Sequence, residues 1–136
     1  MMKKYLKTSL VFTILALVAG VFYREFTKWN GFTGTTTLAF MHTHFFVLGT
    51  GLYLFVALFV KAMPELKEQK AFNVFDRLHP IALVLFEVML LVRGIVQVLA
   101  LSVSEGMVAG IAGITHILLL VSLVSFGLAL VKSAKD

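Results

Sequence analysis

Four long apolar runs, residues 5–23, 37–60, 79–101 and 108–131, constrain the fold more than any other feature of the sequence. A helix needs about 20 mostly apolar residues to cross the hydrocarbon core of a bilayer. The runs are continuous and do not alternate every second residue as the strands of outer-membrane barrels do. Because a helix satisfies its own backbone hydrogen bonds in lipid, the sequence predicts an all-α protein with four transmembrane helices.

The composition and the short connections refine this prediction. The 136 residues are 60% hydrophobic and 14% charged, whereas soluble domains average about 45–50% apolar and about 25% charged residues. The expected partner is therefore the lipid bilayer, and the length allows a single domain, residues 1–136. Short connections place consecutive helices antiparallel, which predicts an up-down four-helix bundle.

Lysine and arginine residues are distributed unevenly over the ends of the predicted helices. Arg24 and Lys28 fall at one end of the bundle. Nine fall at the other end: Lys3, Lys4, Lys7, Lys61, Lys67, Lys70, Arg77, Lys132 and Lys135. The positive-inside rule then predicts a multi-pass protein of the bacterial inner membrane with both termini in the cytoplasm. The same rule accounts for the net charge of +5, so nucleic acid is not an expected partner.

Several classes of chemistry are excluded or disfavoured by what the sequence lacks. The absence of cysteine excludes disulfides, thiolate metal sites and covalent c-type haem attachment. The sequence contains no serine–histidine–acid set and no phosphate-binding loop, which argues against a hydrolase or a nucleotide-dependent enzyme. Whether the protein catalyses a redox reaction stays open.

The polar residues of three predicted helices fall at a similar depth. His42 and His44 lie one to two turns inside the second helix, and His116 lies about two turns inside the fourth, both counted from the outer ends. Arg93 and Gln97 lie about two turns and one turn from the outer end of the third helix. Ionisable side chains in a membrane usually face the bundle interior and mark functional sites, so we expect one polar site in the outer third.

The phase of these residues around their helices limits how they can meet. Arg93 and Gln97 are four residues apart and share a face of the third helix. His42 and His44 are two residues apart, or about 200° around a helix, so they cannot point at the same spot. One imidazole is expected to face the bundle centre and the other a different helix, and the sequence does not decide which.

Haem b is the cofactor that we expect at this site. The axial ligands would be His116 together with either His42 or His44, because haem iron binds imidazole on one or both sides. Arg93, with Gln97 beside it, would pair with the haem propionates. The expected function is electron transfer, with a quinone or a redox protein as partner, or the sensing of haem or a gas.

Two other functions remain open. His42, His44 and His116 could bind copper or zinc for transport or buffering, although Arg93 would repel a bare cation. Alternatively, the chain is a cofactor-free accessory subunit in which polar contacts fix the helix register. Arg93 would then pair with Glu87 or extend to the headgroups, and self-association is left open. Glu87 itself is expected to be a proton carrier or a hydrogen-bonded structural carboxyl.

The run of residues 42–49, HTHFFVLG, resembles the His-x-His helix of haem–copper oxidase catalytic subunits. In those subunits the two histidines bind different haems on opposite faces of one helix. The resemblance covers about a dozen residues, and the chain is too short for the oxidase core, so oxygen reduction is not implied. With the segment FYREFTK at residues 22–28, most of the chain is similar to a family of small, uncharacterised four-helix bacterial membrane proteins.

Overall fold

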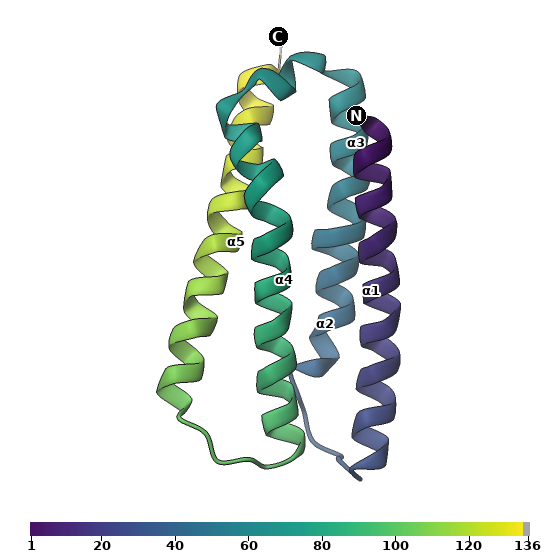
Figure 1. The fold of residues 1–136 in the computed structure, drawn as a ribbon, viewed down its shortest axis with the longest axis vertical. Coiled ribbons are helices and arrows are strands. Elements are labelled where there is room, and N and C mark those ends of the chain that lie inside the picture. Colours follow the sequence, from purple (N-terminus) through teal and green to yellow (C-terminus); the bar gives the residue numbers. More distant parts are fainter. Residues whose placement is uncertain (135–136) are drawn as a thin grey trace.

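Four long helices make up the computed structural model, which describes residues 1–134 and contains no strand among them (Figure 1). The first is α1 (Met2–Trp29). The second is continuous but has three parts, namely α2 (Leu38–His44), the π-helix η1 (Phe45–Gly51) and α3 (Leu52–Ala62). A short 3₁₀ helix, η2 (Pro64–Glu68), leads to α4 (Lys70–Val98), and α5 (Glu105–Ser133) completes the fold.

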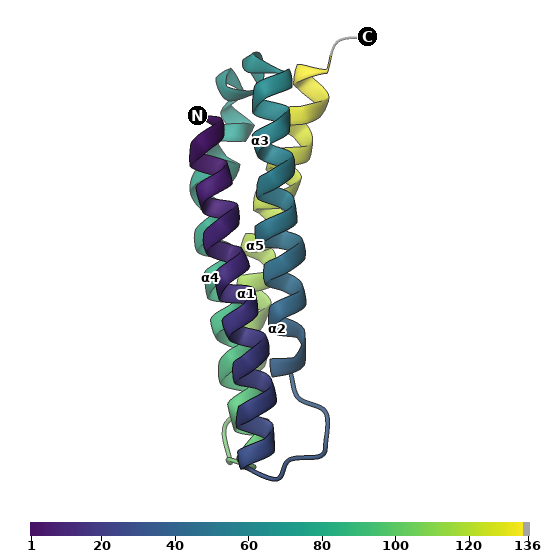
Figure 2. The same cartoon turned by 90° about the vertical axis from the view of Figure 1, so that its right-hand side faces the viewer.

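The predicted all-α, four-helix architecture is confirmed. All four long helices are long and apolar enough to cross a membrane. Consecutive long helices run in opposite directions, and the start of α1 and the end of α5 lie at the same end of the bundle (Figures 1 and 2). The side of a membrane that this end faces, and the bacterial inner membrane as location, stay predictions. Below, the end that carries Met1 is called the inner end.

Helix α4 begins at Lys70, well before the predicted start at residue 79. Proline is disfavoured inside a helix because it lacks a backbone N–H and its ring clashes with the preceding turn. Pro80 was therefore expected in the first turn of the third predicted helix. In the structure the helix continues through Pro80 because the segment before it is amphipathic. Phe72 and Phe75 are buried, whereas Asn73 is exposed. The aromatic side chains anchor this turn in the core.

The core is richest in aromatic side chains towards the inner end of the bundle. Phe75 of α4 stacks on Phe126 of α5 with ring centroids 4.6 Å apart, and Phe12 of α1 stacks on Tyr53 of α3 at 5.6 Å. The outward-facing side chains are also apolar, and those more than half exposed include Leu10, Val18, Phe55, Leu58, Ile81, Ile117 and Leu120. An apolar exterior of this extent is expected where lipid replaces water as the solvent.

Close contacts of glycines bring the first three long helices together. A Cβ atom on Gly49 would lie 2.6 Å from Phe12 of α1, and one on Gly94 would lie 2.8 Å from the backbone nitrogen of Leu38. Small residues at such points let helix backbones approach closely. Helix α5 packs mainly on α4, and its outer half swings away from the other helices (Figure 1).

Candidate functional site

His44 and His116 both contact one phenyl ring, that of Phe86. The His44 imidazole lies at the end of α2 with its ring centroid 5.1 Å from that of Phe86 on α4. The His116 imidazole of α5 lies 4.7 Å from the same ring in an edge-on arrangement. The separation of the two imidazole centroids is therefore at most the sum of these two distances. We call His44, Phe86 and His116 the histidine–phenylalanine triad.

The two imidazoles of the triad have the same local anchoring. Nδ1 of His44 lies 2.8 Å from the carbonyl oxygen of Phe40, and Nδ1 of His116 lies 2.7 Å from that of Ala112. Each partner is four residues earlier on the same helix. A carbonyl oxygen can only accept, so Nδ1 is the donor in both rings. In the neutral rings Nε2 then carries a free lone pair, which is the form that binds a metal.

His42 points to a different helix from His44. A Cβ atom on Gly20 of α1 would lie 3.7 Å from Cβ of His42, so this imidazole packs between α2 and α1. Its Nδ1 is buried and has no hydrogen-bond partner among residues 1–134, and its Nε2 lies 3.4 Å from the hydroxyl of Thr43. His42 is therefore not part of the triad.

Arg93 and Gln97 lie outward of the triad on α4. Arg93 is exposed and lines a groove of about 670 Å³ that also includes Glu105 at the start of α5. The side-chain oxygen of Gln97 accepts a 2.8 Å hydrogen bond from the backbone N–H of Thr37. Gln97 thus joins the start of α2 to α4, while Arg93 remains available to an anion in the groove.

Glu87 follows Phe86 in the sequence and is buried like it. Its side chain is 2% exposed, and neither carboxylate oxygen has a hydrogen-bond partner within the described chain. Arg93 and Glu87 form no ion pair among residues 1–134, so the expected pairing of these two residues is not found there. A buried carboxyl without a partner is costly unless it is neutral.

His79 is a central polar contact, although it is the first residue of the predicted helix 79–101 and was therefore expected at a helix end. The side chain is fully buried, with Nε2 2.9 Å from the carbonyl oxygen of Leu48 in η1 and Nδ1 3.0 Å from the hydroxyl of Ser122 on α5. The spacing of Phe72, Phe75, His79 and Phe86 follows one face of a helix and would have revealed its inward phase. This spacing begins at Phe72, before the predicted helix start near Pro80, so the prediction did not include it.

The structure thus brings two of the three outer histidines together, through Phe86, and turns the third away. Among residues 1–134 no group of three histidine or acidic side chains is close enough to hold a metal ion.

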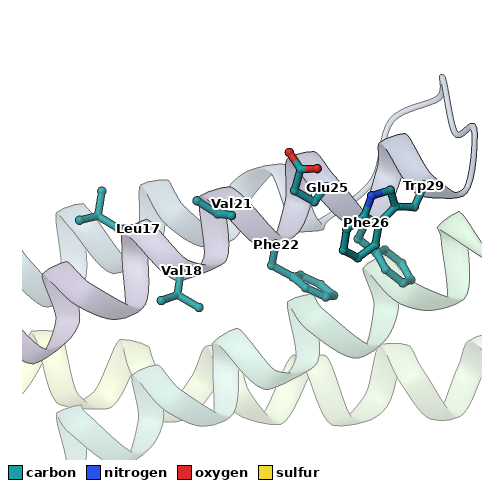
Figure 3. Close-up of a pocket in the computed structure, with 7 residues that line it drawn as sticks. All are labelled: Leu17, Val18, Val21, Phe22, Glu25, Phe26 and Trp29. Carbon is teal, nitrogen blue, oxygen red and sulfur yellow. The ribbon is translucent and has the colours of Figure 1, made fainter.

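A separate apolar groove of about 430 Å³ follows the outer half of α1, where Phe22 and Phe26 point to the same side (Figure 3). It is lined by Leu17, Val18, Val21, Phe22, Glu25, Phe26 and Trp29.

Comparison with known families gives one match. The family model described as "Protein of unknown function (DUF2871)" matches residues 2–133. The chain belongs to the DUF2871 family. This confirms the expected membership of a small, uncharacterised four-helix family. No curated protein and no solved structure matches the chain.

Proposed function

We propose that this DUF2871 protein binds haem b inside the membrane and uses it for electron transfer or for sensing haem or a gas. His44 and His116 are the proposed axial ligands. The observation that carries the proposal is the shared arrangement of the two imidazoles, each with Nδ1 on a backbone carbonyl, a free Nε2, and contact with Phe86. Metal-bound histidines usually donate their other ring nitrogen in this way.

The position of Arg93 supports the same proposal. Arg93 follows Phe86 by seven residues, so both side chains leave α4 on nearly the same side, and Arg93 lies about 10 Å further outward. A haem held near Phe86 with its propionates outward would direct them towards the exposed guanidinium. Arginine binds carboxylates with two parallel hydrogen bonds, which favours it over lysine for this role.

The outer half of α5 leaves room next to His116. Cβ atoms added to Gly110 and Gly113 would meet no atom within 4 Å. Gly113 is three residues before His116 and therefore shares its face. Small residues beside a ligand histidine suit a flat macrocycle. Phe86 contacts both imidazoles, so haem binding between them requires this phenyl ring to move aside.

The first prediction is a haem spectrum that depends on the triad. Protein purified in detergent from haem-replete cells should show a Soret band, and His116→Ala and His44→Ala should each remove most of it, because each change deletes one axial nitrogen. His42→Ala is the matched control, since it changes an imidazole on the same helix that packs against α1, and it should keep the band. The measurement is an absorbance spectrum with quantification of extracted haem.

A colourless wild-type preparation from the same cells would refute the haem proposal. Copper or zinc bound at one ion per chain and lost in both His44→Ala and His116→Ala would indicate metal binding instead. A protein that carries neither haem nor metal, and whose stability survives removal of His42, His44 and His116, would indicate a cofactor-free accessory subunit.

A further inference from the structure

The groove of about 670 Å³ at the outer end of the bundle is lined by two charges of opposite sign. Arg93 contributes a guanidinium from α4, and Glu105 contributes a carboxylate from the first turn of α5. Both residues are exposed, and neither side chain makes an ion pair or a hydrogen bond among residues 1–134. Opposite charges that line one groove without pairing leave a positive and a negative position for a ligand.

The turn between α4 and α5 builds the rest of this groove. Ala100 has a positive φ of 51°, and the backbone N–H of Leu101 donates a 3.0 Å hydrogen bond to the carbonyl oxygen of Val96. A residue in this left-handed conformation ends a helix, and it is usually glycine. The turn places residues 101–103 beside the outer end of α4. The groove is lined by Arg93, Val96, Gln97, Leu101, Ser102, Val103, Glu105, Val108 and Ala109.

Hydrogen-bond donors accompany the positive charge. The side-chain oxygen of Gln97 is occupied by the N–H of Thr37, but its amide nitrogen donates no hydrogen bond within the described chain. The hydroxyl of Ser102 also has no partner among residues 1–134. Arginine binds phosphate with two parallel hydrogen bonds, and amide and hydroxyl donors can add to them. This part of the groove therefore suits a phosphate group.

The carboxylate of Glu105 narrows the class of ligand further. A simple anion would be repelled by Glu105 and a simple cation by Arg93, whereas a ligand that carries both charges avoids both conflicts. Quaternary ammonium groups are recognised by the faces of aromatic rings. None of the groove's lining residues within the described chain is aromatic. A primary ammonium instead donates N–H hydrogen bonds to a carboxylate, so it is the cation that fits Glu105.

We propose that the groove binds the headgroup of a phosphoethanolamine lipid, with its phosphate on Arg93 and its ammonium on Glu105. The groove lies at the ends of two helices that are long and apolar enough to cross a membrane, which is the level of lipid headgroups. Its apolar residues, among them Val96, Leu101 and Val108, suit the first carbons of the acyl chains. The ligand is therefore the whole lipid and not the free headgroup.

Binding of this lipid does not depend on bound haem. Arg93 is also the proposed partner of the haem propionates, but a guanidinium has five N–H donors and can serve a propionate and a phosphate together. Glu105 has no part in haem binding. Glu105→Gln should therefore lose the lipid preference and keep the Soret band, and a colourless wild-type preparation should still show the lipid preference.

Native mass spectrometry of the full chain in detergent tests the lipid class, because bound lipid and bound haem differ in mass and are counted separately. Phosphatidylethanolamine, phosphatidylcholine and phosphatidylglycerol with the same acyl chains are added at equal concentration. The wild type should bind phosphatidylethanolamine several-fold more than either of the others. The choline lipid has no N–H donor for the carboxylate, and the glycerol lipid has no cation.

Glu105→Gln removes the negative charge and keeps the shape, so it should reduce phosphatidylethanolamine binding to the level of phosphatidylcholine. Glu25→Gln is the matched control, because this carboxylate lies near the outer end of α1 beside Arg24, and it should keep the preference. Equal binding of the three lipids by the wild type, or an unchanged preference in Glu105→Gln, would overturn the site. Displacement of the lipid by an equal concentration of free phosphoethanolamine would overturn the lipid as its ligand.

Discussion

His79 shows how a single residue can join several helices at the centre of a helical bundle. A carbonyl oxygen can only accept, so Nε2 of His79 donates to Leu48. Nδ1 lies 3.0 Å from the Ser122 hydroxyl, whose single hydrogen also lies within reach of the Leu119 carbonyl oxygen at 2.8 Å. The imidazole therefore joins η1, α4 and α5. In contrast, Glu87 is buried without any such partner in the part of the chain that the structure describes. These two polar residues of the same apolar run thus have different surroundings, because His79 contacts two other helices and Glu87 has no hydrogen-bond partner among residues 1–134.

We predict that His79→Ala destabilises the bundle by roughly 1–3 kcal/mol, since it leaves the Leu48 carbonyl and the Ser122 hydroxyl without this partner and opens a cavity. Ser122→Ala should cost less, because the hydrogen bond to Leu48 remains. Thermal unfolding in detergent measures both. If His79→Ala unfolds at the temperature of the wild type, the imidazole does not hold the helices together.

At the scale of the elements, the second long helix owes its shape to its contacts with α1 and α4. Its middle part, η1, is a π-helix in which the carbonyls of Leu48 and Thr50 accept hydrogen bonds from side chains of other helices. Gly49 and Gly94 lie where neighbouring helices come closest. The outer start of α2 is fixed by Gln97. These contacts set the direction in which His42 and His44 point.

Gly94→Ala should weaken the α2–α4 contact by about 1–3 kcal/mol, because the added methyl group would overlap Leu38 and crowd its backbone nitrogen. Gly127→Ala on α5 is the matched control, since its Cβ would meet no atom within 4 Å. There alanine should be neutral or stabilising by up to about 1 kcal/mol. Unfolding temperatures of the two variants give the comparison, and equal destabilisation would contradict the close approach.

For the whole molecule, the arrangement of helices places the start of α1, the end of α5 and η2 at one end of the bundle, together with most of the basic residues (Figure 2). An ion pair of 2.7 Å between Lys4 of α1 and Asp76 of α4 lies at this end. The opposite end carries the groove with Arg93 and Glu105. The molecule is thus polar at its ends and apolar along its sides, as a bilayer requires.

The orientation in the membrane can be checked with reporter fusions. A reporter that is active only in the cytoplasm should be active when fused after Ser133. An alkaline phosphatase fused after Gly31, in the loop that follows α1, should be active because that loop faces outward. The reverse pattern would show that the lysine-rich end lies outside, and the proposed haem site would then lie in the cytoplasmic half.

The amino-acid sequence by itself determined the helical class, the four long helices and their up-down order. Backbone hydrogen bonding in an apolar run, hydropathy and connection length are local properties, so they can be read along the chain. Only the tertiary structure decided which side chains meet. Lipid-facing and core-facing residues are equally apolar here, so periodicity carries little information about which way a side chain points. His79 is the exception, because the amphipathic segment before it marks its inward phase, whereas the contacts of Gly49 and Gly94 decide where His42 and Glu87 lie.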